Sequence, residues 1–153
     1  PGMEGYEHRN IGLERDAEKG TISTKPENHQ RMVIARQAKI EQVANQIPLL
    51  QVQGNPQSDT LLIGWGSTEG HLHAAANELG CALAHFNYIN PLPKNTEEVL
   101  RQYKRIVVCE LNSGQFAAYL RSKIAGISLE QYNELTAQPF AVDRIVNFVK
   151  NSL

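Results

Sequence analysis

The sequence predicts an α/β protein in which helices cover both faces of a mostly parallel sheet. Short apolar runs of the kind that form buried strands alternate along the chain with amphipathic stretches at helical spacing. The run at residues 60–63 also leads through a glycine-containing turn directly into a helix, which is half of a β-α-β unit. We therefore expect a three-layer α/β/α sandwich with a sheet of four or five strands.

Length and composition agree with one domain that has a sizeable core. The chain has 153 residues and a net charge of −1, and a domain of this size buries about 70% of the surface of its unfolded chain. The balanced charge does not indicate a nucleic-acid or membrane partner, and no apolar run reaches the roughly 20 residues of a membrane span. Cys81 and Cys109 lie in apolar runs and are expected to be buried thiols of a cytoplasmic protein.

The first part of the chain differs from the rest. Residues 1–25 hold four glycines, mixed charge and few apolar side chains, which is typical of an extended arm or linker. The sequence begins with proline, as expected of a processed chain or of a piece of a longer one. We divide the chain into this arm and a domain at residues 26–153.

The domain is expected to open with a long helix. Thr24 and Glu27 have the spacing of a capping box, in which each side chain accepts a hydrogen bond from a backbone amide near the other residue. The helix should run to about Ile47, since Pro48 cannot continue it. Its apolar stripe consists of Val33, Ile40, Val43, Ala44 and Ile47.

Two strands and a second helix follow. The strands are expected at residues 49–53 and 60–63, and the first of them can lie antiparallel at an edge. Ser67 or Thr68 can cap the helix predicted at residues 68–79. The rest of the chain repeats the alternation: a strand at 81–86, a stiff connection at 87–93, a short helix with Asn95 and Glu98 as capping box, a strand at 106–109, a turn at 110–115, a helix ending at Gly126, an undecided segment at 127–140, and a last helix with the stripe Val142, Ile145, Val146, Val149 and Leu153.

Most unusual residues of the sequence lie in three turns that follow predicted strands. In open α/β sheets, ligands and partners meet the carboxyl ends of the parallel strands, so these turns should form a functional edge. The candidate site residues are Gly64, Trp65, Gly66, Ser67, Thr68, Asn90, Glu110, Asn112, Gly114 and Gln115.

The edge does not contain a recognisable catalytic or metal-binding set. The glycine spacing after residue 63 fails the dinucleotide fingerprint, because its third glycine is one residue late. Amides at the start of the second helix can hold an anion, but Ser67 or Thr68 can satisfy the same amides. Glu110 can be read as a general base, although a role in hydrogen-bonding the turn is favoured. His71 and His73 are two apart on a helix and cannot chelate one ion.

Several segments together resemble a known family. Residues 61–68 (LLIGWGST), 88–93 (YINPLP) and 110–115 (ELNSGQ) resemble, in order and spacing, the C-terminal part of the alpha subunit of 2-oxoacid:ferredoxin oxidoreductases, especially the 2-oxoglutarate branch. In the arm, residues 12–16 (GLERD) are similar to the family's Gly-Leu-Glu-His-Asp stretch. Arg15 stands where the family usually has histidine, so no role of that histidine is carried over.

The resemblance implies a fold and a function. The implied fold is that of the transketolase C-terminal-like domain, with three layers and five strands, one of them antiparallel. The implied function is that of a non-catalytic C-terminal domain in a thiamine-dependent enzyme, which oxidatively decarboxylates a 2-oxoacid, forms an acyl-CoA and passes electrons to ferredoxin. The isolated chain is then expected to be inactive.

The resemblance also implies partners and cofactors outside this chain. The expected partners are the remaining domains of the alpha subunit and the beta subunit, with ferredoxin as partner of the complex. Thiamine diphosphate, iron–sulfur clusters and coenzyme A are expected in the intact enzyme, none of them held by this chain. The alternative hypothesis is a domain that binds an anion or coenzyme A with the carboxyl-edge turns, and a stand-alone interaction module is a third.

Overall fold

The structure is a computed structural model that describes residues 2–7 and 12–151. The chain divides into two compact units, Pro1–Val43 and Ala44–Leu153. The structure thus groups the long helix with the arm, whereas the predicted division at residue 25 had placed this helix in the domain. Residues 1 and 8–11 of the arm, and Leu153 of the predicted last stripe, lie outside the described residues.

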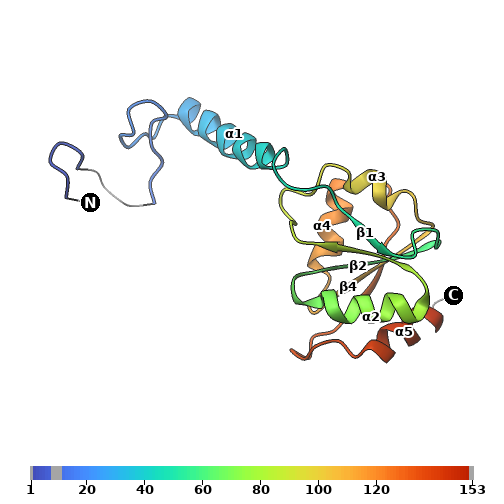
Figure 1. The fold of residues 1–153 in the computed structure, drawn as a ribbon. Helices are drawn as coiled ribbons and strands as arrows, with labels where there is room; N and C mark the ends of the chain where they lie inside the picture. The colour runs from blue at the N-terminus through green and yellow to red at the C-terminus, as the bar shows by residue number, and fades with distance from the viewer. Residues whose placement is uncertain (1, 8–11, 152–153) are drawn as a thin grey trace. The chain divides into compact units, whose positions relative to one another are not determined.

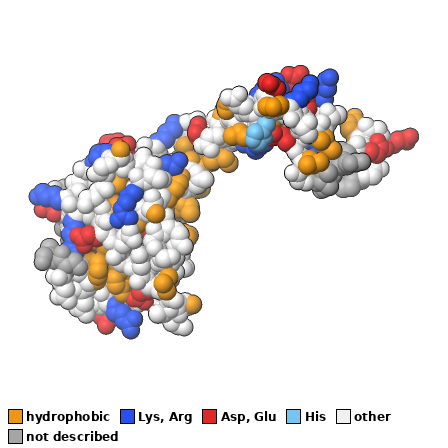
Figure 2. Space-filling view, turned by 180° about the vertical axis from the view of Figure 1, so that it is seen from behind, with side chains coloured by type: hydrophobic (Ala, Val, Ile, Leu, Met, Phe, Trp, Pro, Cys, Tyr) orange, Lys and Arg blue, Asp and Glu red, His pale blue; other side chains and the backbone are white. Residues whose placement is uncertain are grey.

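The N-terminal unit consists of the arm and helix α1 (Pro26–Val43). The helix is four residues shorter than predicted, because residues 44–46 form a turn. No described residue of α1 is buried, and the exposed fraction of its apolar side chains reaches 60% at Ile34. The predicted stripe is therefore present in the sequence but covers no core. Hydrophobic side chains at the surface are visible in Figure 2.

The second unit contains a five-stranded sheet (Figure 1). Its strands are β1 (Val52–Gly54), β2 (Thr60–Trp65), β3 (Ala82–Phe86), β4 (Arg105–Glu110) and β5 (Glu130–Asn133). Their order is β1-β3-β2-β4-β5, with β1 antiparallel to β3 and all other pairs parallel. This confirms the expected sheet, and the undecided segment supplies β5.

Helices cover both faces of this sheet. A one-turn 3₁₀ helix, η1 (Gly66–Thr68), leads into α2 (Glu69–Leu79), which packs with α5 (Val142–Asn151) over one face. The other face is covered by α3 (Thr96–Leu100) and α4 (Gln115–Lys123), and Figure 1 shows the two helical layers with the sheet between them. Among the described residues, no helix is long and apolar enough to cross a membrane.

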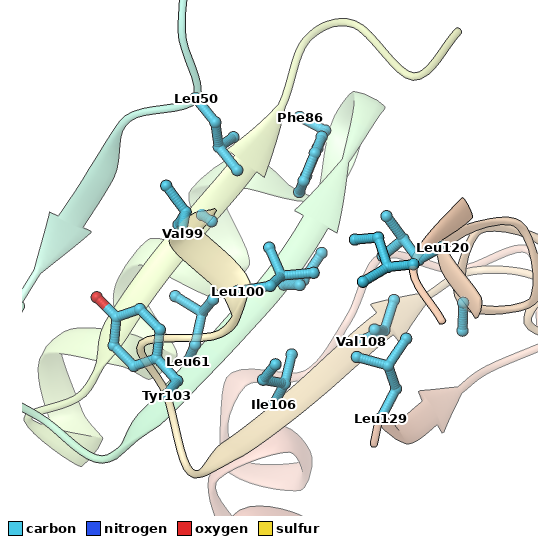
Figure 3. Close-up of a cluster of buried hydrophobic side chains, with 14 of the residues drawn as sticks. Leu50, Leu61, Phe86, Val99, Leu100, Tyr103, Ile106, Val108, Leu120 and Leu129 are labelled. Carbon is cyan, nitrogen blue, oxygen red and sulfur yellow. The ribbon is translucent and has the colours of Figure 1, made fainter. Parts of the chain in front are cut away.

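The core forms because every central strand is apolar on both sides. Successive side chains of β2 alternate between the two helical layers, so Leu61 and Ile63 belong to one cluster and Leu62 to the other. Figure 3 shows the first cluster, in which Leu100 and Leu120 from α3 and α4 meet these strand residues. Each fully buried leucine of this kind contributes about 1.5–3 kcal/mol to folding.

Two predicted helix caps are wrong. The Thr68 side chain does not cap α2, because its hydroxyl bonds to the backbone of Trp65. The Asn95 side chain does not cap α3 and instead forms two hydrogen bonds with the backbone of Leu50, at 2.8 and 3.0 Å. In both cases the spacing predicts a bond to the first amides of the helix, but the side chain bonds to a backbone group outside that helix.

The chain connections place a switch point at the middle of the sheet. Helix α2 leads away from β2 on one face, while α4 leads away from the neighbouring strand β4 on the opposite face. The connections that follow these two strands therefore diverge, which leaves a crevice outside their carboxyl ends. The turns after β2 and β4 border this crevice.

Candidate functional site at the carboxyl edge of the sheet

The turn after β2 is held by its own threonine. The amide of Trp65 donates to Thr68 Oγ1 at 3.2 Å, and this hydroxyl donates to the carbonyl of Trp65 at 2.9 Å. Gly64 is required because a Cβ at this position would meet the side chains of Leu72 and Thr68. The close approach of α2 to β2 thus fixes the direction in which the backbone leaves the strand.

Glu110 organises the turn after β4. Its side chain is completely buried, and its two carboxylate oxygens accept hydrogen bonds from the amides of Phe116 and Ala117, each at 2.9 Å. A carboxylate is favoured at this place because the first amides of α4 carry the positive end of the helix dipole. The structure confirms the favoured role of Glu110 in hydrogen-bonding the turn, and its burial leaves no path for a substrate to reach it.

Asn112 completes the cap of the same helix. Its side-chain oxygen accepts from the amides of Gly114 and Gln115 at 2.8 and 3.1 Å. Together with Glu110, it satisfies the amides with which α4 starts. The N-terminus of α4 is therefore occupied by the protein's own side chains and is closed to an external anion.

Trp65 connects the three turns. Its indole nitrogen donates to Glu110 Oε2 at 3.4 Å, which links the ends of β2 and β4. Its ring centroid lies 6.3 Å from that of Phe116, and Phe116 lies 6.4 Å from Tyr119. The hydroxyl of Tyr119 in turn donates to Asn90 Oδ1 at 3.2 Å, so the turn after β3 joins the same cluster.

Two hollows flank Trp65. The first, which we call the tryptophan hollow, has a volume of about 320 Å³ and is lined by Trp65, Ile89, Asn90, Gln115, Phe116 and Tyr119. The second has a volume of about 230 Å³ and is lined by Trp65, Gly66, Ser67, Thr68, Leu111 and Asn112. No lysine, arginine or carboxylate is among the described residues that line either hollow.

The structure brings most of the predicted site residues to this edge. Gly64 and Glu110 are buried beneath the surface, and Gly114 is packed against Gln131 and Asn133 of β5. The remaining candidates line one or both hollows, as the residues named above show. Four lining residues, Ile89, Leu111, Phe116 and Tyr119, were not predicted as site residues. Tyr119 lies one helical turn after Phe116, and the position of both on α4 was the available signal.

A histidine supports the turn after β2 from the neighbouring strand. His85 on β3 is buried, and its Nε2 donates to the carbonyl of Gly66 at 3.1 Å. Its Nδ1 has no hydrogen-bond partner among the described residues. The nearest carboxylate, that of Glu69, lies 3.9 Å from Nδ1.

Both cysteines are unreactive, protonated thiols, and the described residues contain no candidate metal centre. Burial raises the pKa of the Cys81 thiol to about 11 and also raises the pKa of the Cys109 thiol. Both are therefore neutral thiols near pH 7, while thiolates are the form that binds metals. Residues 2–7 and 12–151 include no group of three or more histidine, cysteine, aspartate or glutamate side chains arranged around one point.

In the N-terminal unit, Glu14 and Arg15 of the arm bond to residues of α1. Glu14 accepts a hydrogen bond from Arg36 at 2.9 Å and pairs with His29. The side-chain amide of Asn28 donates to the carbonyl of Arg15 at 2.9 Å. The hydrogen bond from Arg36 holds the pKa of the Glu14 carboxyl below its usual value, and the contact with His29 is the second cause.

Comparison with known proteins agrees with this architecture. No protein-family profile matches the sequence. The whole chain aligns, with 41% identity over 160 residues, with 24% of 2-oxoglutarate oxidoreductase subunit KorA from Mycobacterium tuberculosis.

A solved structure shares the fold. It is that of the 2-oxoglutarate:ferredoxin oxidoreductase from Magnetococcus marinus, with 2-oxoglutarate, coenzyme A and succinyl-CoA bound. The two structures superimpose with a TM-score of 0.83 and 28% identity, over 99% of this chain and 27% of that chain. This chain thus spans about a quarter of the length of both relatives. Over its whole length, this chain is therefore similar to one part of a 2-oxoglutarate oxidoreductase subunit.

Proposed function

We propose that this chain acts as the non-catalytic C-terminal domain of the alpha subunit of a 2-oxoglutarate:ferredoxin oxidoreductase, and that its carboxyl edge and its arm dock on the rest of the enzyme. The observation that carries the proposal is the alignment of the whole chain with one quarter of an enzyme subunit. The intact enzyme would decarboxylate 2-oxoglutarate oxidatively, form succinyl-CoA and transfer electrons to ferredoxin in the cytoplasm.

The chemistry of the edge supports a docking role. The side chains of Glu110 and Asn112 already bond to the amides at the start of α4, and the Thr68 hydroxyl already bonds to the backbone of the turn after β2. What remains accessible is an apolar hollow with amide side chains on its lining and no charged group. Such a surface suits contact with protein, whose interface cores are depleted of charge and rich in aromatic residues.

The cofactors of the family do not fit the residues of this chain. Iron–sulfur clusters are held by cysteine thiolates, and both cysteines here are buried neutral thiols. Polyanions such as coenzyme A and thiamine diphosphate require cations or free helix amides, which the lining of the tryptophan hollow and the capped α4 do not supply. We therefore assign the cofactors to other parts of the enzyme.

The test of docking is assembly of the intact enzyme. Alanine at Trp65, Asn112 and Gln115 together, in the full-length alpha subunit, should reduce the yield of the complex with the beta subunit in size-exclusion chromatography. The matched control is alanine at Gln57 and Gln102, which are exposed and precede β2 and β4 at the opposite edge. Assembly that is unchanged by the triple substitution would contradict the proposal.

The second candidate function is binding of an anion or of coenzyme A. It is favoured by the hollow at Gly66, Ser67 and Thr68, which lies where α2 begins, and by the coenzyme A bound in the enzyme from Magnetococcus marinus. Calorimetric titration of the 153-residue chain with coenzyme A, thiamine diphosphate and 2-oxoglutarate separates the candidates. Saturable binding that Ser67→Asp weakens would favour the second, and docking alone predicts no heat from any of the three.

A further inference from the structure

We propose that the tryptophan hollow is the anchoring socket of this docking surface, and that it receives one large apolar side chain from an uncharged polypeptide segment of the rest of the enzyme. The inference rests on the docking function proposed above and specifies its partner. It is drawn from the lining of the hollow, from the unused hydrogen-bonding groups beside it, and from the apolar surface around it.

The aromatic residues that line the tryptophan hollow favour an apolar side chain as its occupant. Trp65 and Tyr119 are half-buried, with Phe116 buried between them. These rings are held in place, because Trp65 bonds to Glu110 and Tyr119 bonds to Asn90. A fixed aromatic wall loses little conformational entropy when it is covered, which is the property of residues that dominate binding at protein interfaces.

The size of the hollow and the groups beside it indicate a peptide. The volume of about 320 Å³ is at the lower limit of small-molecule sites and is large enough for one large side chain together with part of the backbone that carries it. Gln115 lines the hollow and is exposed, and no described residue bonds to its side-chain amide. A carboxamide has two donors and an acceptor, which match the carbonyl and amide groups on either side of an inserted side chain.

The charge of the site excludes an ionic partner. The described lining residues include no acidic or basic side chain, and the ammonium of Lys123 lies over the ring of Tyr119 at 5.4 Å. A charged group in the hollow would lose its hydration without gaining an ion pair. The segment that enters should therefore be neutral.

The apolar surface continues beyond the hollow. Ile89 is 37% exposed and its neighbour Tyr88 is 45% exposed. Ile89 belongs to the lining and Tyr88 lies next to it in the chain, so a polypeptide that fills the hollow can also cover Tyr88. Because the related subunits are about four times as long as this chain, they contain ample polypeptide to do so.

The first experiment fills the hollow from Gln115 and keeps the aromatic wall of Trp65, Phe116 and Tyr119. Gln115→Phe places a ring at its lining, and Ser122→Phe places the same ring at an exposed position of the same helix. In the full-length alpha subunit, Gln115→Phe should weaken association with the rest of the enzyme by about 30-fold, the effect of losing one hot-spot contact. Ser122→Phe should leave association unchanged, and both variants should unfold at the parental temperature.

The second experiment observes the hollow directly. Trp65 is the single tryptophan of the chain, so its indole N–H gives one NMR signal that reports on occupancy. N-acetylleucine amide, a neutral side chain between two peptide groups, should shift this signal at millimolar concentration. N-acetyllysine amide, which differs by its charge, should not, and the shift should disappear in the Gln115→Phe variant.

The outcomes separate the socket from the docking function. If Gln115→Phe assembles normally while the triple alanine variant does not, docking stands and the socket is wrong. If both assemble normally, the docking function is wrong as well. Equal shifts with the leucine and lysine amides would overturn the apolar selectivity, and saturable binding of coenzyme A that shifts the Trp65 signal would replace the peptide by a small molecule.

Discussion

Single residues at the carboxyl edge act by making contacts that the local sequence does not specify. Glu110 is the clearest case, because its carboxylate bonds to amides six and seven residues further along the chain and to an indole on another strand. Gly114 is a second case, because it has a positive φ of 94° and lies against two side chains of β5. Both residues can be tested by single substitutions.

Glu110→Gln should destabilise the sheet domain by about 2 kcal/mol, since hydrogen bonds to a charged group contribute roughly 1.5–3 kcal/mol. Glutamine keeps one acceptor oxygen but directs an NH₂ group at an amide that also donates. The measurement is urea unfolding followed by circular dichroism. Glu97→Gln, at a half-exposed position on α3, serves as control and should change the free energy of unfolding by less than about 0.5 kcal/mol.

Gly114→Ala should destabilise the domain more than Gly126→Ala does. Both glycines have positive φ, 94° and 72°, so alanine is strained at either position by about 1–2 kcal/mol. Only at Gly114 would the new methyl group also meet Gln131 and Asn133, while at Gly126 nothing lies within 4 Å of it. Equal unfolding free energies for the two variants would show that the contact with β5 has no energetic weight.

At the scale of elements, α1 differs from every other helix of more than one turn that the structure describes, because it has no buried residue. Most of the stability of a helix in a protein comes from packing of its apolar face. A helix that covers no core is expected to be the least stable element. Its contacts with the arm are ion pairs and hydrogen bonds at exposed positions, which contribute little.

Hydrogen exchange tests the stability of α1. In the isolated chain, its amides should exchange at least about 100-fold faster than those of β2 and β4, which lie in the middle of the sheet. In the assembled enzyme, the proposed docking of this unit should slow their exchange. Equal protection of α1 and β2 in the isolated chain would contradict the expectation.

The contact between arm and helix should depend on pH through Glu14. The pKa of its carboxyl is below the usual 4.5, chiefly because of Arg36. The ionised form therefore favours the contact, so its contribution is complete above pH 4.5 and is lost as the pH falls through the lowered pKa. The pKa of Glu14, read from the carbon NMR signal of its carboxyl, should lie below 4.5. This pKa should rise in Arg36→Gln but not in the control Lys39→Gln.

At the scale of the whole molecule, both core clusters are built from residues of the second unit alone, between Leu50 and Val149. Removal of residues 1–43 should therefore leave the free energy of unfolding of the sheet domain unchanged within about 0.5 kcal/mol. Urea unfolding of residues 44–153, compared with the complete chain, is the measurement. A larger loss would mean that the N-terminal unit contributes to the core.

The sequence patterns left open whether the first strand is antiparallel, but they were sufficient for the alternation of strands and helices and for the gathering of three turns at one edge. These features follow from burial patterns and turn residues within a few positions, such as Gly80, whose φ of 64° ends α2. The hollows were not predictable, because their lining comes from three separate turns and one helix. Tyr119, for example, lines the site only because α4 packs beside the turn that carries Asn90.

By itself, therefore, the sequence determined most of the strands and helices and where the parallel strands end, since these depend on local periodicity and backbone preference. The segment at 127–140, which supplies β5, stayed undecided. The tertiary structure alone decided the partners of the polar side chains. Thr68 and Asn95 have the spacing of helix caps, yet they bind the backbones of Trp65 and Leu50. A buried hydrogen-bonding group must find a partner, and which one it finds depends on the groups that folding brings within 3 Å or so of it.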